Sequence, residues 1–248
     1  MPLTPTAAEL LSVTDLSVRF RQPQGEVFAV DKVSFSLASG DVLGIVGESG
    51  SEKSQILFSL MGLLAGNNSA SGQALFNGRD LLAMIPAALD EERGAHLSMI
   101  FYEPVSALDV SIQAQVINLL MDLQDRMGLA LVFIAHNLSV VRHISHQVMV
   151  MCLCHVVAAT SRDAFYAKPL HPYSQALMDA VPEPDPVREK GRRGTALTGE
   201  LPSVLNPPKG CVFATRCPKV QARCHVERPK LRQFGNRQAA CHFVETAA

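Results

Sequence analysis

Gly47-Glu48-Ser49-Gly50-Ser51-Glu52-Lys53-Ser54 is the stretch of sequence that decides the fold. It fits the phosphate-loop pattern Gly-x4-Gly-Lys-Ser/Thr at every defined position except the second glycine, where Glu52 stands. In an intact loop, backbone N–H groups surround the phosphates, the lysine reaches the terminal phosphates and the hydroxyl binds Mg²⁺. The candidate nucleotide-binding residues are therefore Gly47, Ser49, Gly50, Ser51, Lys53 and Ser54.

Glu52 opposes phosphate binding in two ways. Glycine at this position allows the backbone to approach a phosphate closely, which a residue with a side chain hinders. A carboxylate also places a negative charge beside a polyanion. We therefore expect reduced nucleotide affinity. The alternative interpretation is that the segment is only a strand-to-helix turn built from small residues.

The residues around the loop favour the order strand, loop, helix. Residues 11–37 alternate between apolar and polar side chains and are rich in β-branched and aromatic residues, as in antiparallel strands with one face in water. Residues 42–46 form a short apolar run that suits a buried strand, and apolar residues recur at helical spacing over residues 54–64. This context favours a phosphate loop over a simple turn.

Further along the chain, predicted strands alternate with predicted helices. We expect a strand at residues 74–76, a helix at 110–127, a strand at 129–134, a helix at 138–144 and a strand at 147–157. Such alternation is typical of a mainly parallel sheet covered on both faces. The predicted fold class is α/β, with an antiparallel β part at the N-terminal end.

Residues 97–109 read Leu-Ser-Met-Ile-Phe-Tyr-Glu-Pro-Val-Ser-Ala-Leu-Asp. This segment resembles the Walker B strand, catalytic glutamate and D-loop of ABC ATPases, which have a phosphate-loop NTPase fold. The resemblance implies that Glu103 is the general base that polarises the attacking water, and that residues 106–109 touch a partner subunit. Residues 134–137, Ile-Ala-His-Asn, resemble the switch region, so His136 would contact the γ-phosphate.

The segment departs from that family at several points. Tyr102 occupies the position of the aspartate that helps to hold Mg²⁺. The interval from Lys53 to Glu103 is far shorter than in the family and contains no Leu-Ser-Gly-Gly-Gln-like signature and no Q-loop glutamine. Residues 98–101 also resemble the strand that precedes that glutamine. We infer an internal deletion that removed the helical subdomain.

Four cysteines gather near the C-terminus. Residues 181–186 and 191–194 have the composition of a linker, so a small separate unit begins after about Pro182. Four thiolates in a Pro-rich, helix-poor tail suit an iron–sulfur cluster or a structural zinc, and the spacing alone does not separate the two. The alternative is unligated thiols. The candidate metal ligands are Cys211, Cys217, Cys224 and Cys241.

The tail also carries a second resemblance. His171-Pro172-Tyr173, Gly199-Glu200-Leu201-Pro202-Ser203, Asn206-Pro207-Pro208 and the residues around the four cysteines resemble the C-terminal extension of oligopeptide/dipeptide/nickel importer ATPases. That resemblance implies a [4Fe–4S] cluster on the four cysteines. The expected division is a truncated ATP-binding domain at residues 1–165 and the extension at residues 166–248. Cys152 and Cys154 lie on a predicted buried strand and are expected to be core residues.

Composition limits the remaining classes of function. The 248 residues suit one domain with an appendage, and a formal net charge of −1 provides no basic field for nucleic acid. The start of the chain lacks the pattern of a cleaved signal, and the longest apolar run, residues 148–159, is too short to span a bilayer. We expect a cytoplasmic protein, peripheral at the inner face of the plasma membrane when assembled.

Three functions follow from these features. The first is an ATPase subunit that pairs with a second ABC ATPase subunit and with transmembrane permease subunits to energise uptake of peptides or a related solute, using ATP and Mg²⁺. The second is a non-catalytic remnant, since Glu52, Tyr102 and the missing signature affect the same chemistry. The third is a metal-binding module in which the cysteine tail is the functional part.

Overall fold

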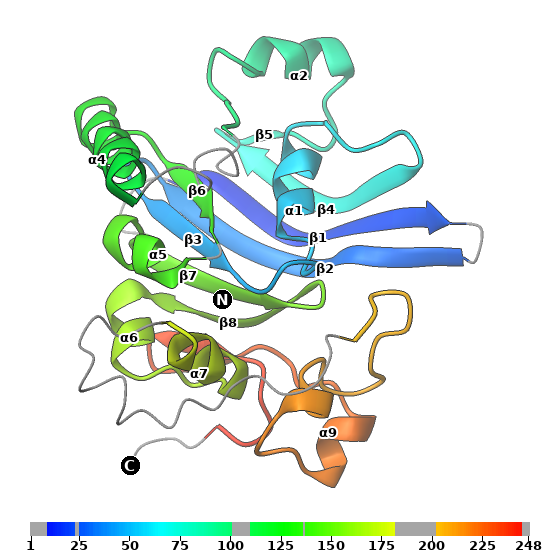
Figure 1. Cartoon of the computed structure of the whole chain (residues 1–248). Coiled ribbons are helices and arrows are strands. Elements are labelled where there is room, and N and C mark those ends of the chain that lie inside the picture. The colour runs from blue at the N-terminus through cyan, green and yellow to red at the C-terminus, as the bar shows by residue number, and fades with distance from the viewer. Residues whose placement is uncertain (1–8, 23–24, 101–109, 136, 182–201, 245–248) are drawn as a thin grey trace.

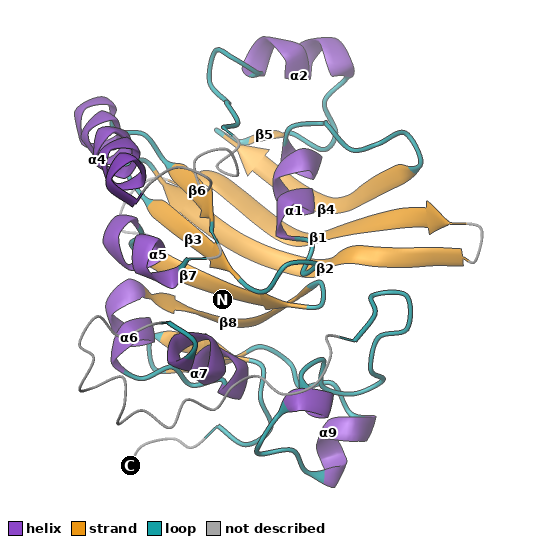
Figure 2. Cartoon of the chain, in the orientation of Figure 1, coloured by secondary structure: helices purple, strands orange, loops and turns teal. Residues whose placement is uncertain are grey.

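The computed structural model describes residues 9–22, 25–100, 110–135, 137–181 and 202–244. Its body is an α/β fold with two sheets, and the C-terminal extension packs beside β8, opposite α2 (Figure 1). Figure 2 shows the helices distributed around these sheets. In the described ranges, no helix is both long enough and apolar enough to cross a membrane.

The first sheet contains four antiparallel strands in the order β2-β1-β4-β5. Its strands are β1 (Glu9–Gln22), β2 (Gly25–Ala38), β4 (Asn68–Phe76) and β5 (Arg79–Asp80). The alternating pattern of residues 11–37 correctly predicted this antiparallel part. Alternation arises because successive side chains point to opposite faces, and one face packs on the core.

The second sheet has six strands in the order β6-β3-β7-β8-β10-β9. Its parallel part is formed by β6 (Leu131–Ile134), β3 (Val42–Val46) and β7 (Gln147–Cys152). The strands β8 (His155–Ser161), β10 (Arg237–Ala239) and β9 (Arg232–Phe234) continue the sheet in antiparallel fashion. Because β10 pairs with β8, the C-terminal extension shares the sheet that carries the phosphate loop.

The single strand predicted at residues 147–157 was wrong. The structure divides it into β7 and β8, which form a hairpin. The turn residues Leu153 and Cys154 have φ values of 42° and 68°, in the left-handed region that glycine and asparagine usually occupy. Both side chains are buried, so packing holds a turn that no local signal marks.

Eight helical segments are described. They are α1 (Lys53–Leu60), α2 (Pro86–Glu92), α4 (Val110–Met127), α5 (Leu138–Ile144), α6 (Arg162–Ala167), α7 (Pro172–Asp179), the 3-10 turn η1 (Ala214–Arg216) and α9 (Ala222–Val226). The helix predicted over residues 54–64 ends earlier, and Gly62 follows it with a φ of 62°. The sequence predicts that a helical subdomain is missing between the phosphate loop and Glu103. In the described part of the chain between β5 and α4, α2 is the only helix.

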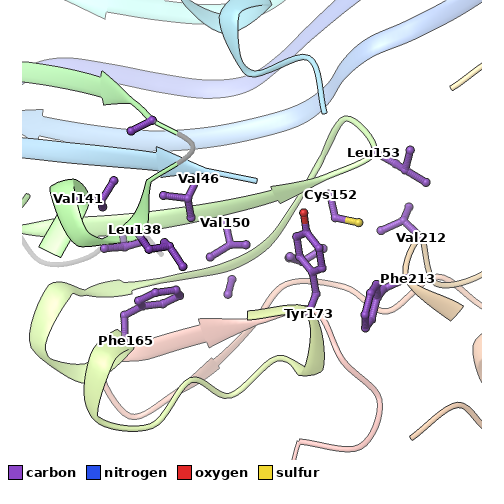
Figure 3. Close-up of a cluster of buried hydrophobic side chains, with 14 of the residues drawn as sticks. Val46, Leu138, Val141, Val150, Cys152, Leu153, Phe165, Tyr173, Val212 and Phe213 are labelled. Carbon is purple, nitrogen blue, oxygen red and sulfur yellow. The ribbon is translucent and has the colours of Figure 1, made fainter. Parts of the chain in front are cut away.

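Two apolar clusters hold these layers together. One fills the space between the two sheets and α1, around Leu16, Ile45 and Ile56. The other lies on the opposite face of the second sheet and joins α5, α6, α7 and the C-terminal extension (Figure 3). In Figure 3, Tyr173 and Phe213 lie beside Cys152 of β7. The extension is therefore built on the core of the phosphate-loop domain.

Candidate functional site

The loop between β3 and α1 passes close to the neighbouring strand β7. Gly47 begins it with a φ of 156°, and a Cβ at this position would lie 2.3 Å from the carbonyl oxygen of Met151. Real Cβ atoms do not approach a backbone oxygen so closely, so only glycine fits here. The close packing of loop against strand fixes where the loop starts.

Lys53 is held inside the loop. Its side chain is buried, with the residue 5% exposed, and Nζ donates hydrogen bonds to Gly47 O at 2.9 Å, Glu48 O at 2.9 Å and Ser51 Oγ at 3.0 Å. Burial lowers the pKa of Lys53 to about 8, against the opposing effect of the nearby glutamates. The lysine therefore points into the loop, and a phosphate that binds here would take over some of its hydrogen bonds.

Glu52 has the backbone conformation that the phosphate-loop glycine would adopt. Its φ and ψ are 59° and 27°, in the left-handed region, and it stands at the N-terminal cap of α1 without making a side-chain capping bond. Burial raises the pKa of its carboxyl group, although the charge of Lys53 opposes that effect. The helix begins with an acidic side chain at the end where anions bind.

A cavity of about 660 Å³ lies over the loop and the carboxyl end of β6. Its lining includes Ser49, Gly50, Lys53 and Ser54, four of the six predicted nucleotide-binding residues, together with Glu52. The other two lie beneath it: Gly47 packs on β7, and the buried Ser51 donates its hydroxyl to Glu48 O at 2.7 Å. The volume is in the range of ligand pockets, and ligands of open parallel sheets bind at this edge.

Both predicted catalytic residues, Glu103 and His136, lie outside the described residues, as does Tyr102. Described neighbours of these positions line the phosphate-loop cavity. These neighbours are Ile100, Ala135 and Asn137.

The four predicted metal ligands, Cys211, Cys217, Cys224 and Cys241, line one small cavity of about 20 Å³. Burial raises the pKa of Cys211 to about 11 and that of Cys217 and Cys241 above the ordinary value, and nearby thiolates add to each effect. Across the described ranges, no group of three or more His, Cys, Asp or Glu side chains is arranged so that it could hold a metal ion. The thiols thus share a cavity without forming a ligand set.

The other two cysteines, Cys152 and Cys154, are buried core residues, as predicted. Burial raises the pKa of both thiols to about 12. An apolar environment disfavours the thiolate, which is the form that binds metals and attacks electrophiles. Neither thiol is suited to chemistry at neutral pH.

No local pattern in the sequence indicates that Tyr173 and Arg216 reach the phosphate loop. The N–H of Glu48 donates to Tyr173 Oη at 2.9 Å, and the Arg216 guanidinium donates to both Glu48 carboxylate oxygens at 2.5 and 2.8 Å. Hydrogen bonds from Arg216 hold the pKa of Glu48 below its ordinary value despite partial burial. Two residues of the C-terminal extension thus bind one loop residue.

Two family models match the chain. The model described as ABC transporter matches residues 30–156, which include the phosphate loop. The model described as the oligopeptide/dipeptide transporter C-terminal region matches residues 159–224. Their order along the chain is that of the body and the extension seen in the structure.

Similar proteins and structures agree with these models. The oligopeptide transport ATP-binding protein OppF of Escherichia coli is 36% identical over 328 residues, covering 95% of this chain and 96% of that protein. OppF of Salmonella typhimurium is 35% identical over 326 residues, covering 95% and 96%. The structure of MJ1267, an ATP-binding cassette of an ABC transporter in its ADP conformation, is similar with a TM-score of 0.53 at 16% identity, covering 66% of this chain and 96% of that one.

Because the sequence identity to MJ1267 is low, the similarity of the two structures supports the fold alone. The OppF alignments extend over nearly the whole of both proteins. The phosphate loop and the cavity above it lie in the segment that the first model matches. Three of the four C-terminal cysteines lie in the segment that the second model matches, and Cys241 lies beyond its end. The chain belongs to the family of oligopeptide ABC transporter ATP-binding proteins.

Proposed function

We propose that this chain is the ATP-binding subunit of a peptide importer and that its ATP hydrolysis is impaired. The observation that carries the proposal is the cavity of about 660 Å³ in which Lys53, Ser54 and the loop residues line one wall. The names of the OppF relatives support oligopeptides as the transported solute. ATP and Mg²⁺ are the ligands that this family and this loop imply.

ATP binding would use groups that the structure already places. The ammonium of Lys53 would exchange its bonds to Gly47 O and Glu48 O for bonds to phosphate oxygens. The Ser54 hydroxyl would hold Mg²⁺, which would neutralise negative charge on the phosphates. The N-terminal end of α1 would add the positive end of the helix dipole.

For hydrolysis, we propose the roles that the family motif assigns by position. Glu103 would polarise the attacking water, and His136 would contact the γ-phosphate. Three features weaken this chemistry. Glu52 is one of the residues that line the cavity, Tyr102 replaces an aspartate that helps to hold Mg²⁺, and the signature and Q-loop are absent between Lys53 and Glu103.

The alignments support the proposed internal deletion. The alignment with OppF of Escherichia coli runs over 328 positions, whereas the present chain has 248 residues in all. Positions of the relative therefore have no counterpart in this chain, although the alignment covers 95% of it. We propose that these positions include the helical subdomain and signature loop, which in an intact subunit complete the partner's nucleotide site.

We further propose that Cys211, Cys217, Cys224 and Cys241 hold a [4Fe–4S] cluster or a structural zinc. The donor chemistry fits, because four thiols line one cavity and their mutual repulsion as thiolates would be relieved by a cation. A bound metal group would supply stability to a segment with little regular structure. Ligation would require the thiols to rearrange, since the described residues contain no group of three or more such side chains placed to hold a metal ion.

The proposed assembly contains a second ABC ATPase subunit and transmembrane permease subunits. It places the chain in the cytoplasm, peripheral at the inner face of the plasma membrane. Within it, residues 1–165 form the truncated ATP-binding domain and residues 166–248 the extension. The second candidate function, a non-catalytic remnant that pairs with an intact subunit, is supported by the left-handed Glu52 at the phosphate loop.

Equilibrium dialysis with radiolabelled ATP, combined with a phosphate-release assay, tests the proposal. Wild-type chain should bind ATP in the presence of Mg²⁺, Lys53→Met should lose most of that binding, and neither should release phosphate at an appreciable rate. Lys209→Met, a change at an exposed lysine that lines neither the loop cavity nor the cysteine cavity, serves as the control. ATP binding that is unaffected by Lys53→Met would rule out this site, and rapid phosphate release would rule out impairment.

Metal analysis and absorption spectra of the full chain, purified without oxygen, test the cysteine site. The wild type should carry iron and sulfide or zinc, and Cys217→Ser should lose it. Cys154→Ala is the matched control, since this buried cysteine does not line the cavity. Equal metal content in all three proteins, or none in the wild type, would contradict the proposed site.

A further inference from the structure

Glu48 occupies a central place in the phosphate loop because its backbone and its side chain bind different parts of the molecule. Its carbonyl oxygen accepts hydrogen bonds from Lys53 Nζ at 2.9 Å and from Ser51 Oγ at 2.7 Å. Its N–H and its carboxylate instead bind Tyr173 and Arg216 of the C-terminal extension. Any shift of Glu48 therefore moves an acceptor of the phosphate-binding lysine.

The contact with Arg216 has the geometry of a strong, directional pair. Both terminal nitrogens of the guanidinium bind the carboxylate, and a bidentate pair fixes orientation as well as distance. The Arg216 side chain is 5% exposed and that of Glu48 is 28% exposed. Within the described residues, Arg216 Nε has no hydrogen-bond partner, so Glu48 supplies the compensation for burying this cation.

Tyr173 provides a rigid second contact. Its side chain is fully buried, and its ring packs against Phe213 with the ring centroids 5.1 Å apart. Phe213 immediately precedes the turn η1, which ends at Arg216. The two groups that hold Glu48 are thus packed together, and both adjoin the cavity of the cysteines, which Phe213 and Cys217 help to line.

We propose that the C-terminal extension positions the phosphate loop, with Arg216 and Tyr173 as positioning residues that act on Lys53 through Glu48. The proposal rests on the proposed function for its consequence, which is a change in ATP affinity. Its structural content is independent of ATP: loss of the Arg216–Glu48 pair should free the loop to open locally. The cysteine-containing segment next to Arg216 would then influence the nucleotide site through this pair.

Hydrogen–deuterium exchange of the full chain tests the positioning directly. Arg216→Gln and Glu48→Gln should each raise exchange in peptides that cover residues 47–53, by about tenfold, since local opening limits exchange in such segments. Peptides from β1 and β2 should keep wild-type exchange. Arg216→Lys, which keeps the charge, should recover part of the protection. The control Arg223→Gln, whose side chain is 56% exposed and pairs with Glu227 at the C-terminal cap of the same short helix, should leave the loop unchanged.

The double variant Glu48→Gln/Arg216→Gln separates positioning from general destabilisation. If the two residues act as one unit, the double variant should exchange no faster in the loop than either single variant. Additive effects, an equal rise in β1 and β2, or wild-type exchange in Arg216→Gln would overturn the proposal. If Arg216→Gln does not fold, Glu48→Gln serves in its place, because it replaces only one carboxylate oxygen by an NH₂ group. Wild-type exchange of the loop in Glu48→Gln would then overturn the proposal.

ATP titration of the same proteins distinguishes this proposal from the proposed function. Arg216→Gln should weaken ATP binding by at least about fivefold, in the range of measured couplings between sites. A wild type that binds no ATP but shows the predicted exchange would refute the nucleotide function and leave the positioning role intact. A wild type that binds ATP, with a variant unchanged in both exchange and affinity, would refute the positioning role alone.

Discussion

Replacing Glu52 by glycine should raise both the affinity for ATP and the stability of the chain. The residue has left-handed backbone angles of φ 59° and ψ 27°, and it helps to line the cavity above the phosphate loop. Glycine adopts these angles without strain and carries no charge. The variant Glu52→Gly therefore removes two separate obstacles, and Glu52→Gln removes the charge while retaining the strained backbone.

The left-handed backbone of Glu52 affects the stability of the chain, and the charge of its carboxylate affects the affinity for ATP. Left-handed backbone angles cost an L-residue about 1–2 kcal/mol, and Glu52→Gly removes this cost. Glycine makes the unfolded chain more flexible, which destabilises the folded state by roughly 0.5–1 kcal/mol. The net effect of Glu52→Gly should therefore be a gain of about 0.5–1 kcal/mol of stability. One carboxylate ~5–8 Å from a phosphate charge, at an effective dielectric of about 20–40, costs about 1–3 kcal/mol. ATP should therefore bind roughly 5- to 150-fold more tightly to both variants.

Calorimetric titration with ATP and urea unfolding measure these quantities. Both variants should gain affinity, while only Glu52→Gly should raise the urea midpoint. If neither variant binds ATP more tightly than the wild type, Glu52 does not face the phosphates and the cavity is not the nucleotide site. A glycine variant less stable than Glu52→Gln would show that the left-handed conformation is not strained.

Three further changes test the surroundings of the loop. Gly47→Ala should abolish ATP binding and lower the thermal unfolding temperature, because its Cβ would lie 2.3 Å from Met151 O, and differential scanning calorimetry and an ATP titration measure both. Tyr173→Phe should lower the free energy of unfolding by about 1–2 kcal/mol in urea, because the N–H of Glu48 loses its acceptor. Folding lowers the pKa of Lys53 from 10.5 to about 8, so the folded chain releases this proton first. The stability of the wild type relative to Lys53→Met should therefore rise between pH 8 and pH 10.5, by up to about 3 kcal/mol, and a flat or falling difference in urea unfolding would contradict this assignment.

The sequence predicted the elements whose signals are local. The apolar run Val42–Val46, the glycine-rich loop and the apolar periodicity after Lys53 specify a strand, a turn and a helix within a short segment, and the structure has them in that order. Strand β4 begins at Asn68, well before the predicted residues 74–76. Pairing with β1 holds these turn-rich residues in a strand, against their intrinsic preference.

Features fixed by packing could not be read from the sequence. The hairpin turn at Leu153 and Cys154 contains no residue that favours left-handed angles, so the two strands were predicted as one. The pair Glu48–Arg216 joins positions separated by 168 residues, and neither residue belongs to a local pattern that names its partner. A pair of this kind depends on how the extension packs against the body, with which it also shares a sheet through β10.

A crystal structure of the chain with Mg²⁺ and ATP would show whether the loop around Lys53 is the nucleotide site. We expect phosphate oxygens within hydrogen-bonding distance of Lys53 Nζ, in place of Gly47 O or Glu48 O. Phosphates bound elsewhere, for example in the separate groove lined by Arg19 and Lys32, with the bonds of Lys53 to the loop unchanged, would contradict it.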